Sequence, residues 1–163
     1  MVWERLGNLI ENINERNTDL KVSLLLGVNL DKKFFPSIAN IIGTDLSTYK
    51  IVRKGQFACK LMSVGRDGVL PLGFLEDYYA FKVKDETIIL PQYLMLCMSR
   101  KEFDRELWFR SGGDVRGGTS WEELCSIKIP VPTLEEQQQI VNSYKSIEER
   151  IKLKKQINDN LVA

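Results

Sequence analysis

The sequence predicts an α+β fold: a mixed, mostly antiparallel sheet with packed helices, followed by one long protruding C-terminal helix. Three observations support this class. Short apolar segments separated by turn residues fill the first half, helical periodicity begins at Pro91, and no glycine or proline follows Pro132. We therefore expect a globular part over residues 1–132 and a separate helix over residues 133–163.

The first half holds most of the expected strands. Residues 3–15 carry apolar side chains at roughly helical spacing interrupted by Gly7, which predicts a short helix and a turn. Residues 24–28 indicate a buried strand, and FFPSIAN indicates a loop because Pro36 resists regular pairing. Further strands are expected at 49–52, 56–62, 69–75 and 78–83, with turns at 53–55 and 65–68.

Helical spacing dominates from Pro91. The apolar residues up to Trp108 fit one core-facing helix that the glycines at 112 and 113 end. Ser120 and Glu123 form a capping-box pattern, which predicts a short helix from residue 121. Residues 126–131 alternate again, and the neighbouring prolines place this strand at a sheet edge or end it.

A second capping-box pattern, Thr133 with Glu136, opens the last helix. A helix of ~30 residues is on the order of 45 Å long, so we expect it to project and pair with another helix. The alternative is a terminal helix that lies back on its own domain. Apolar positions at alternating spacings of four and three form a heptad seam that becomes partly polar. The predicted seam comprises Ile140, Tyr144, Ile147, Ile151 and Leu161.

Several classes of protein are excluded or disfavoured by composition. The chain has no histidine, so Ser-His-Asp and Cys-His catalysis are excluded. The glycine-rich stretch at 112–119 lacks the lysine of a phosphate-binding loop and follows a helix. No apolar run reaches the ~18 residues of a membrane span. Three distant cysteines indicate neither a disulfide framework nor a zinc site, so we expect a cytoplasmic protein with reduced thiols. We expect no enzyme, cofactor or metal.

Charge is unevenly distributed along the chain. The net charge is only +1, yet the window from Lys32 to Arg66 holds seven basic residues and one acid. Its cations lie in or beside predicted turns, where they can meet phosphates. The alternative is a merely solvated charged face. Arg110 and Arg116 add two loop arginines among glycines and hydroxyls, and glycine permits close approach of the backbone to a phosphate.

The stretch GGTSWEELCSIKIPVP at 117–132, followed by LEEQQQI at 134–140, carries a family resemblance. It resembles the segment that closes a target recognition domain in specificity subunits of type I restriction–modification systems. There an arginine-and-serine loop precedes a short helix, an Ile-x-Ile-Pro-x-Pro strand and a Gln-x-x-Ile motif. WERLG at 3–7 and YKIVRKGQF at 49–57 agree with this family, with Gln56 where an acid is usual.

The resemblance implies a DNA sequence reader that has no catalysis of its own. In this family a subunit usually carries two recognition domains separated by two antiparallel helices, and each domain reads half of a bipartite site. Modification subunits supply methyl transfer, and restriction subunits supply translocation and cleavage. Here one domain and one helix are present, which leaves open a half-sized subunit that dimerises, a fragment or a relic gene. A homodimer would read a symmetric, interrupted site.

We therefore expect three kinds of partner: double-stranded DNA, modification and restriction subunits, and a second copy bound through the C-terminal helix. The alternative is a coiled-coil assembly module that no longer reads DNA. A carboxylate-based hydrolase is disfavoured, because no paired acid and base stands in a recognisable setting. The expected DNA-contacting residues are Lys32, Lys33, Lys60, Ser63, Arg66, Arg110, Arg116 and Ser120.

Overall fold

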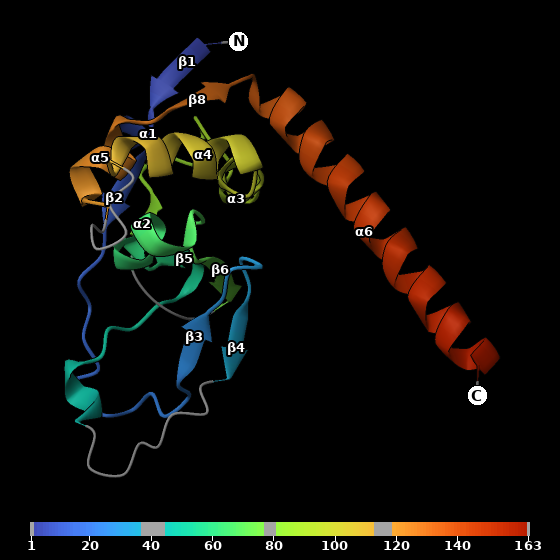
Figure 1. The fold of residues 1–163 in the computed structure, drawn as a ribbon, viewed down its shortest axis with the longest axis horizontal. Helices are drawn as coiled ribbons and strands as arrows, with labels where there is room; N and C mark the ends of the chain where they lie inside the picture. Colours follow the sequence, from blue (N-terminus) through green and yellow to red (C-terminus); the bar gives the residue numbers. More distant parts are fainter. Residues whose placement is uncertain (1, 37–44, 77–80, 113–118, 163) are drawn as a thin grey trace.

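Figure 1 shows a body of short strands and helices from which the last helix projects. This computed structural model describes residues 2–36, 45–76, 81–112 and 119–162. Within these ranges the strands form three antiparallel sheets, so the predicted α+β class with a protruding helix is confirmed. None of the helices in these ranges is long and apolar enough to cross a membrane.

The first and last strands close the body at the end where the long helix begins. Strand β1 (Val2–Arg5) pairs with β8 (Lys128–Val131), and Trp3 lies opposite Pro130. Pro130 is tolerated because β8 has a single partner strand, as predicted for an edge strand. The hydroxyl of Tyr93 donates to the Pro130 carbonyl oxygen at 3.1 Å and joins this sheet to the helices.

The short helix predicted within residues 3–15 is present as the single turn α1 (Leu6–Leu9), but strands flank it on both sides. β1 precedes it and β2 (Ile10–Asn12) follows it. Pairing of β1 with β8, and of β2 with β7 (Phe81–Val83), outweighs the helical spacing of the flanking residues. Gly7 allows α1 to approach α5 (Trp121–Ser126) closely, because a Cβ at this position would lie 2.8 Å from the Cβ of Cys125.

The central sheet has the strand order β2-β7-β5-β6 and carries the core. Its other strands are β5 (Lys54–Cys59), β6 (Leu72–Glu76) and β7 (Phe81–Val83). The rings of Phe57 and Phe81 stack with centroids 4.9 Å apart, and Trp121 tilts against Phe81. The strands predicted at 56–62, 69–75 and 78–83 are present in shortened form, although residues 77–80 lie outside the described ranges.

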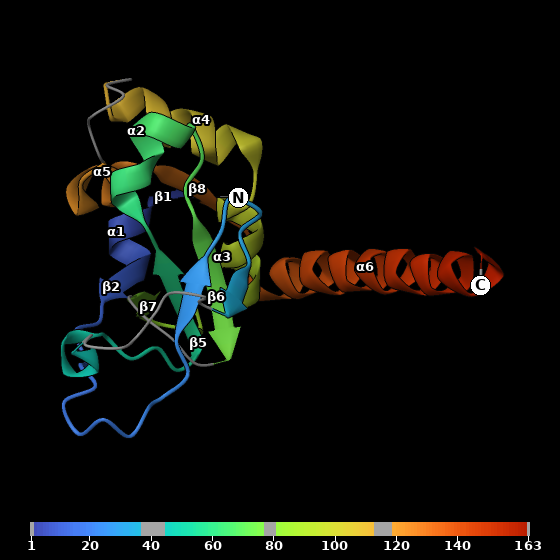
Figure 2. The same ribbon diagram turned by 60° about the horizontal axis from the view of Figure 1, so that its bottom comes forward.

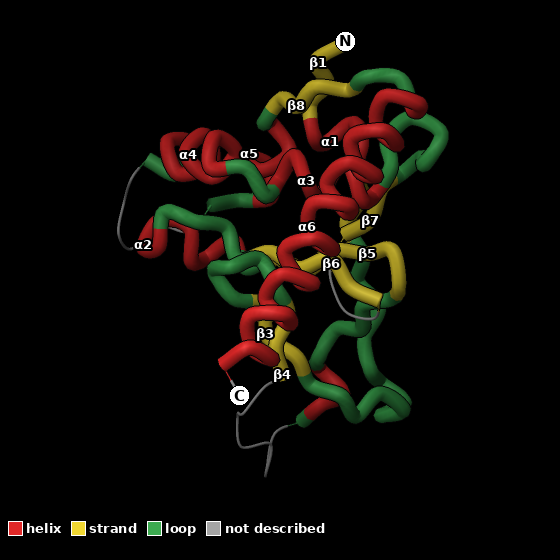
Figure 3. The backbone as a smooth tube through the Cα atoms, turned by 90° about the vertical axis from the view of Figure 1, so that its right-hand side faces the viewer, coloured by secondary structure: helices red, strands yellow, loops and turns green. Residues whose placement is uncertain are grey.

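A hairpin packs on the edge of this sheet, at the end of the body opposite β1 and β8 (Figures 1 and 3). It consists of β3 (Leu26–Val28) and β4 (Phe34–Pro36), so FFP is not a loop as expected. Pro36 is accommodated because it ends the strand. The strand expected at 24–28 to be buried is only half-buried, and Leu24 is exposed.

The ring of Phe34 fixes the hairpin to β6. It lies so close to Gly73 that a Cβ at this position would overlap the ring. The aromatic ring takes the space that any larger residue at 73 would need, which explains a glycine inside a strand.

Two further local predictions are wrong. The strand expected at 49–52 is an extended segment after the 3-10 turn η1 (Leu46–Thr48), with only an isolated bridge between Arg16 and Lys50. The turn expected at 65–68 is the short helix α2 (Val64–Asp67), which follows the 3-10 turn η2 (Leu61–Ser63). Gly68 then ends α2 with a positive φ of 63°.

The single helix expected from Pro91 is two helices, α3 (Pro91–Met98) and α4 (Lys101–Arg110). The break at Ser99 and Arg100 lets both helices turn apolar faces toward the core. The predicted short helix is α5 (Trp121–Ser126), and its capping box is confirmed. The hydroxyl of Ser120 accepts from the Glu123 N–H, and the Glu123 carboxylate accepts from the Ser120 N–H.

Helix α6 (Leu134–Val162) leaves the body after two turns, as Figure 2 shows from a second direction. Thr133 and Glu136 form the predicted capping box. Gln137, fully buried, donates to the carbonyl oxygens of Ile88 and Pro132, both at 2.9 Å, and accepts from the Leu90 N–H at 2.8 Å. Val141 is the next buried residue, so the helix does not lie back on its domain.

The contact of Phe34 with Gly73 leads to a first prediction. Gly73→Ala should lower the free energy of unfolding by about 1–3 kcal/mol, because the new methyl group forces the ring out of its position. Urea unfolding measures this change. Phe34→Leu shortens the overlapping side chain, so the double variant should be less destabilised than the sum of the two single variants. Strict additivity would show that the two residues do not touch.

Candidate nucleic-acid interface

Three of the predicted contact residues lie on one stretch, the end of β5 through α2. Lys60 is exposed at the end of β5, and Ser63 ends η2, although the structure does not describe its side chain. The Arg66 side chain is 65% exposed and bonds to the Asp67 carboxylate at 2.7 and 2.8 Å. This hydrogen bond holds the pKa of Asp67 below its ordinary value, so Asp67 stays charged and holds the guanidinium outward.

Residues before and after the glycine-rich loop lie beside this stretch. The Thr119 N–H donates to the Leu61 carbonyl oxygen at 3.1 Å, and the Trp108 indole lies 3.4 Å from the Gly65 carbonyl oxygen. Arg116 falls outside the described residues. The fold thus places Thr119, the residue that follows the undescribed part of the loop, beside Leu61 and one position from Lys60. We call Lys60, Ser63, Arg66 and Thr119 the closing-loop edge.

Ser120 and Arg110 have structural partners of their own. The Ser120 hydroxyl caps α5 and accepts from the Glu123 N–H at 3.1 Å. Arg110 bonds to Glu106 at 2.5 and 2.8 Å and donates to the Ser126 hydroxyl at 2.9 Å. These contacts hold Arg110 across a groove beside β8.

Lys32 is turned inward, in contrast to the exposed DNA contact that the sequence predicted. Its ammonium lies 2.6 Å from the Asp104 carboxylate and donates to the Met98 carbonyl oxygen at 2.7 Å. The two side chains are 8% and 10% exposed. The Asp104 carboxylate also accepts from the Leu70 N–H at 3.1 Å. Burial lowers the pKa of Lys32, and the bond to Asp104 opposes this effect.

The turn between β3 and β4 aims these two lysines in opposite directions. Lys32 has a positive φ of 57°, which is uncommon for a residue other than glycine, and its side chain is buried. Lys33 is exposed, and its N–H donates to the Asn29 side chain at 2.9 Å. The turn therefore presents Lys33 to solvent while Lys32 anchors it.

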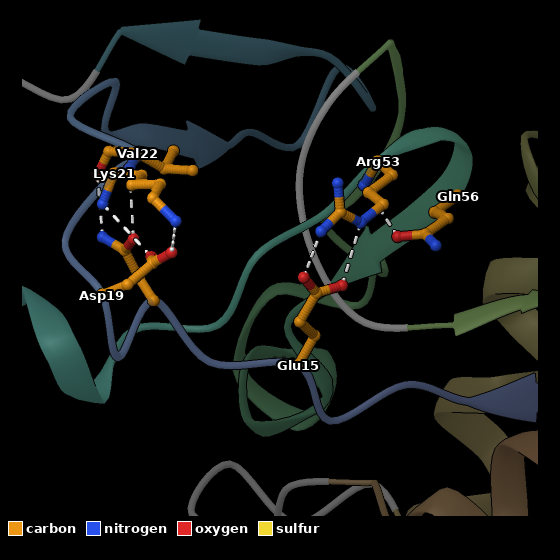
Figure 4. A network of polar contacts seen from close by, with 7 residues as sticks. Glu15, Asp19, Lys21, Val22, Arg53 and Gln56 are labelled. Atoms are coloured by element: carbon orange, nitrogen blue, oxygen red, sulfur yellow. Dashed lines mark hydrogen bonds and ion pairs between the residues drawn. The ribbon is translucent and has the colours of Figure 1, made fainter.

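The remaining cations of the basic window lie around the start of β5. Figure 4 shows Arg53 paired with Glu15, at 2.9 Å for the Nε–Oε2 bond, and the Arg53 N–H donating to Gln56 at 2.7 Å. A side-chain oxygen at position 56 closes this turn, which explains why glutamine can replace the acid usual in the family. The same view shows Lys21 paired with Asp19 at 2.7 Å, in the loop before β3.

The part of the chain described here holds no group of three possible metal ligands among its His, Cys, Asp and Glu residues. Burial raises the pKa of the Cys59 thiol to about 12, and burial also raises the pKa of Cys97 and Cys125. All three thiols are therefore protonated near neutral pH and are poor nucleophiles.

Sequence reasoning missed the partner of Lys32. One signal was available, because Asp104 lies between Phe103 and Leu107 on the buried side of α4. An acid on the apolar face of a helix needs a cationic partner. Which lysine supplies it was not visible, since the two residues are 72 positions apart.

Comparison with known proteins identifies the family of the chain. The family model described as type I restriction modification DNA specificity domain matches residues 72–163, and the chain belongs to this family. The matched range includes Thr119, β8 and α6, whereas Lys60, Ser63 and Arg66 precede it. No curated protein matches the chain. The description of this family names a DNA specificity domain.

Two solved structures are similar in fold. One is described as "Structural basis underlying complex assembly and conformational transition of the type I R-M system". It has a TM-score of 0.54 and is 16% identical in sequence. The alignment covers 93% of the present chain and 39% of the solved one. The HsdS subunit from Thermoanaerobacter tengcongensis has a TM-score of 0.49 and 15% identity, with 93% and 38% covered. The chain thus spans about two fifths of their length.

The buried ion pair leads to a second prediction. Lys32→Met leaves the Asp104 carboxylate without its cation and should lower the free energy of unfolding by about 3–5 kcal/mol. The double variant with Asp104→Leu should recover most of this loss, because no buried charge remains. Lys33→Met, one residue away and exposed, should change stability by less than ~0.5 kcal/mol. Equal effects at both lysines in denaturant unfolding would contradict the assignment.

Proposed function

We propose that residues 1–132 read one half of a bipartite double-stranded DNA target, and that residues 133–163 form a spacer helix. The match of the specificity-domain family over residues 72–163 carries this proposal. The protein would act in the cytoplasm, where modification subunits supply methyl transfer and restriction subunits supply cleavage. The shared fold with a type I system structure supports this role.

The closing-loop edge is the proposed DNA contact. Lys60 and Arg66 supply exposed cations, and we propose that Arg116, in the glycine-rich sequence before Thr119, adds a third. Phosphate contacts of this kind orient a protein on the duplex, whereas base contacts give specificity. Lys33 extends the contact from the β3–β4 turn. Lys32 contributes by holding that turn through Asp104, and Ser120 contributes by capping α5 beside the loop.

Helix α6 is the proposed contact with a second copy. Its seam residues Ile140, Tyr144, Ile147 and Ile151 are between 44% and 57% exposed. These apolar side chains recur at spacings of four and three, the pattern that buries one helix against another. Leu161 continues the seam in the sequence, but its side chain is not described. A pair of chains joined in this way would present two readers at a fixed separation.

DNA binding tests the first part of this proposal. The affinity for duplex DNA should fall steeply with added salt, because each phosphate contact releases counterions. Lys60→Gln and Arg66→Gln should each reduce the slope of log K against log salt by about one. Lys82→Gln is the matched control, since Lys82 is an exposed lysine on β7 outside the closing-loop edge and should leave the slope unchanged. A chain that only assembles would show no measurable DNA affinity in fluorescence anisotropy.

Analytical ultracentrifugation tests the second part. Ile147→Asp places a charge in the centre of the seam and should convert dimers to monomers at micromolar concentration. Ser146→Asp introduces the same charge one residue away, on a different face of α6, and should leave the mass unchanged. A dimer that survives Ile147→Asp would show that another surface joins the two copies.

A further inference from the structure

A groove of about 540 Å³ lies between the β1–β8 ladder and helices α3 and α4. It is at the end of the body where α6 begins, opposite the β3–β4 hairpin (Figures 1 and 3). Residues two apart on a strand share a face, and directly opposed residues share it too. Trp3 and Arg5 therefore share one face with Pro130 and Lys128, and all four line the groove.

Two like charges are opposed on this face. Arg5 lies directly across the ladder from Lys128, and both side chains are exposed. Neither has an ion-pair partner within the described ranges. Like charges at directly opposed positions destabilise an antiparallel pair. The fold therefore carries a local electrostatic cost that an anionic group in the groove would remove.

The other charges of the groove are already balanced. Arg100 lies 3.3 Å from Glu102, and Arg110 lies 2.5 Å from Glu106. The two acids thus have their own cations and do not neutralise Arg5 or Lys128. The unbalanced positive charge is confined to the ladder.

The remaining surface of the groove is apolar. Phe103 and Cys97 line its buried floor beside Pro130, and Trp3, which is 59% exposed, stands at its rim. A large indole left in water beside an apolar floor is typical of a protein-binding site. A duplex presents its phosphates on a broad convex surface and has no apolar side chain to fill this floor.

We propose that this groove binds an acidic segment with apolar side chains, carried by the modification subunit with which the chain assembles. The proposal rests on the proposed function, which supplies such a partner. Carboxylates of the segment would meet Arg5 and Lys128, and an apolar side chain would pack on Trp3 and the floor. The groove is separate from the closing-loop edge, so the chain can hold DNA and this partner together.

Lys128→Glu tests the groove, because it turns the opposed like charges into an opposite pair. The temperature of thermal unfolding should rise, whereas the Kd for the purified modification subunit should increase about tenfold or more. Affinity of the isolated chain for a target duplex should stay within about twofold. Lys21→Glu makes the same charge change on an exposed loop at the far end of the body and should alter neither binding reaction. Trp3→Ala should weaken assembly without loss of stability.

The outcomes separate the two proposals. If Lys128→Glu and Trp3→Ala both leave the Kd for the modification subunit unchanged, the proposal that the groove binds this subunit is wrong, and the proposed function is unaffected. A parallel loss of DNA affinity would also overturn the groove proposal, because the groove would then be a DNA contact. If the wild-type chain itself fails to assemble with the modification subunit, the assembly role and the groove proposal both fall, whereas DNA binding is judged by its own salt dependence.

Discussion

The ion pair between Lys32 and Asp104 holds together the parts of the body that the sequence leaves far apart. Its ammonium joins the β3–β4 turn to the last turn of α3 through Met98, and its carboxylate joins α4 to the chain before β6 through Leu70. A buried pair of this kind adds little net stability, since desolvation offsets much of the attraction. Its effect is positional, because any other placement of the turn leaves a charge buried alone. The turn that presents Lys33 is thereby fixed relative to the helices.

A second polar anchor sets the direction of α6. The amide of Gln137 satisfies two carbonyl oxygens and one N–H of the body, so the first turns of the helix have a single arrangement. The Thr133 capping box defines where the helix starts. Beyond Val141 no buried side chain follows on the described part of α6. Helix α6 is therefore held firmly at its base, and its exposed seam can meet another helix.

Near-neutral net charge conceals different local surfaces. The closing-loop edge carries outward cations, the groove at β1 and β8 combines two unpaired cations with an apolar floor, and the α6 seam is apolar. These three surfaces lie on different parts of the molecule, so DNA, a protein segment and a second copy need not compete for one site. The net charge is only +1 because acidic residues elsewhere in the sequence nearly equal the basic ones in number. Some of these acids form ion pairs, as Glu11 does with Lys82.

The sequence by itself determined the features that depend on near neighbours. Both capping boxes, the long α6 with its seam, the edge position of β8 and the family follow from residues a few positions apart. Tertiary structure alone decided the rest. Residues 2–5 and 10–12 became strands because β8 and β7 pair with them, and Lys32 became an internal anchor because the fold brings it to Asp104, 72 positions away. Arg5 meets Lys128 only through the closing of the ladder. Short segments have too few local interactions to fix their own conformation, so distant partners decide it.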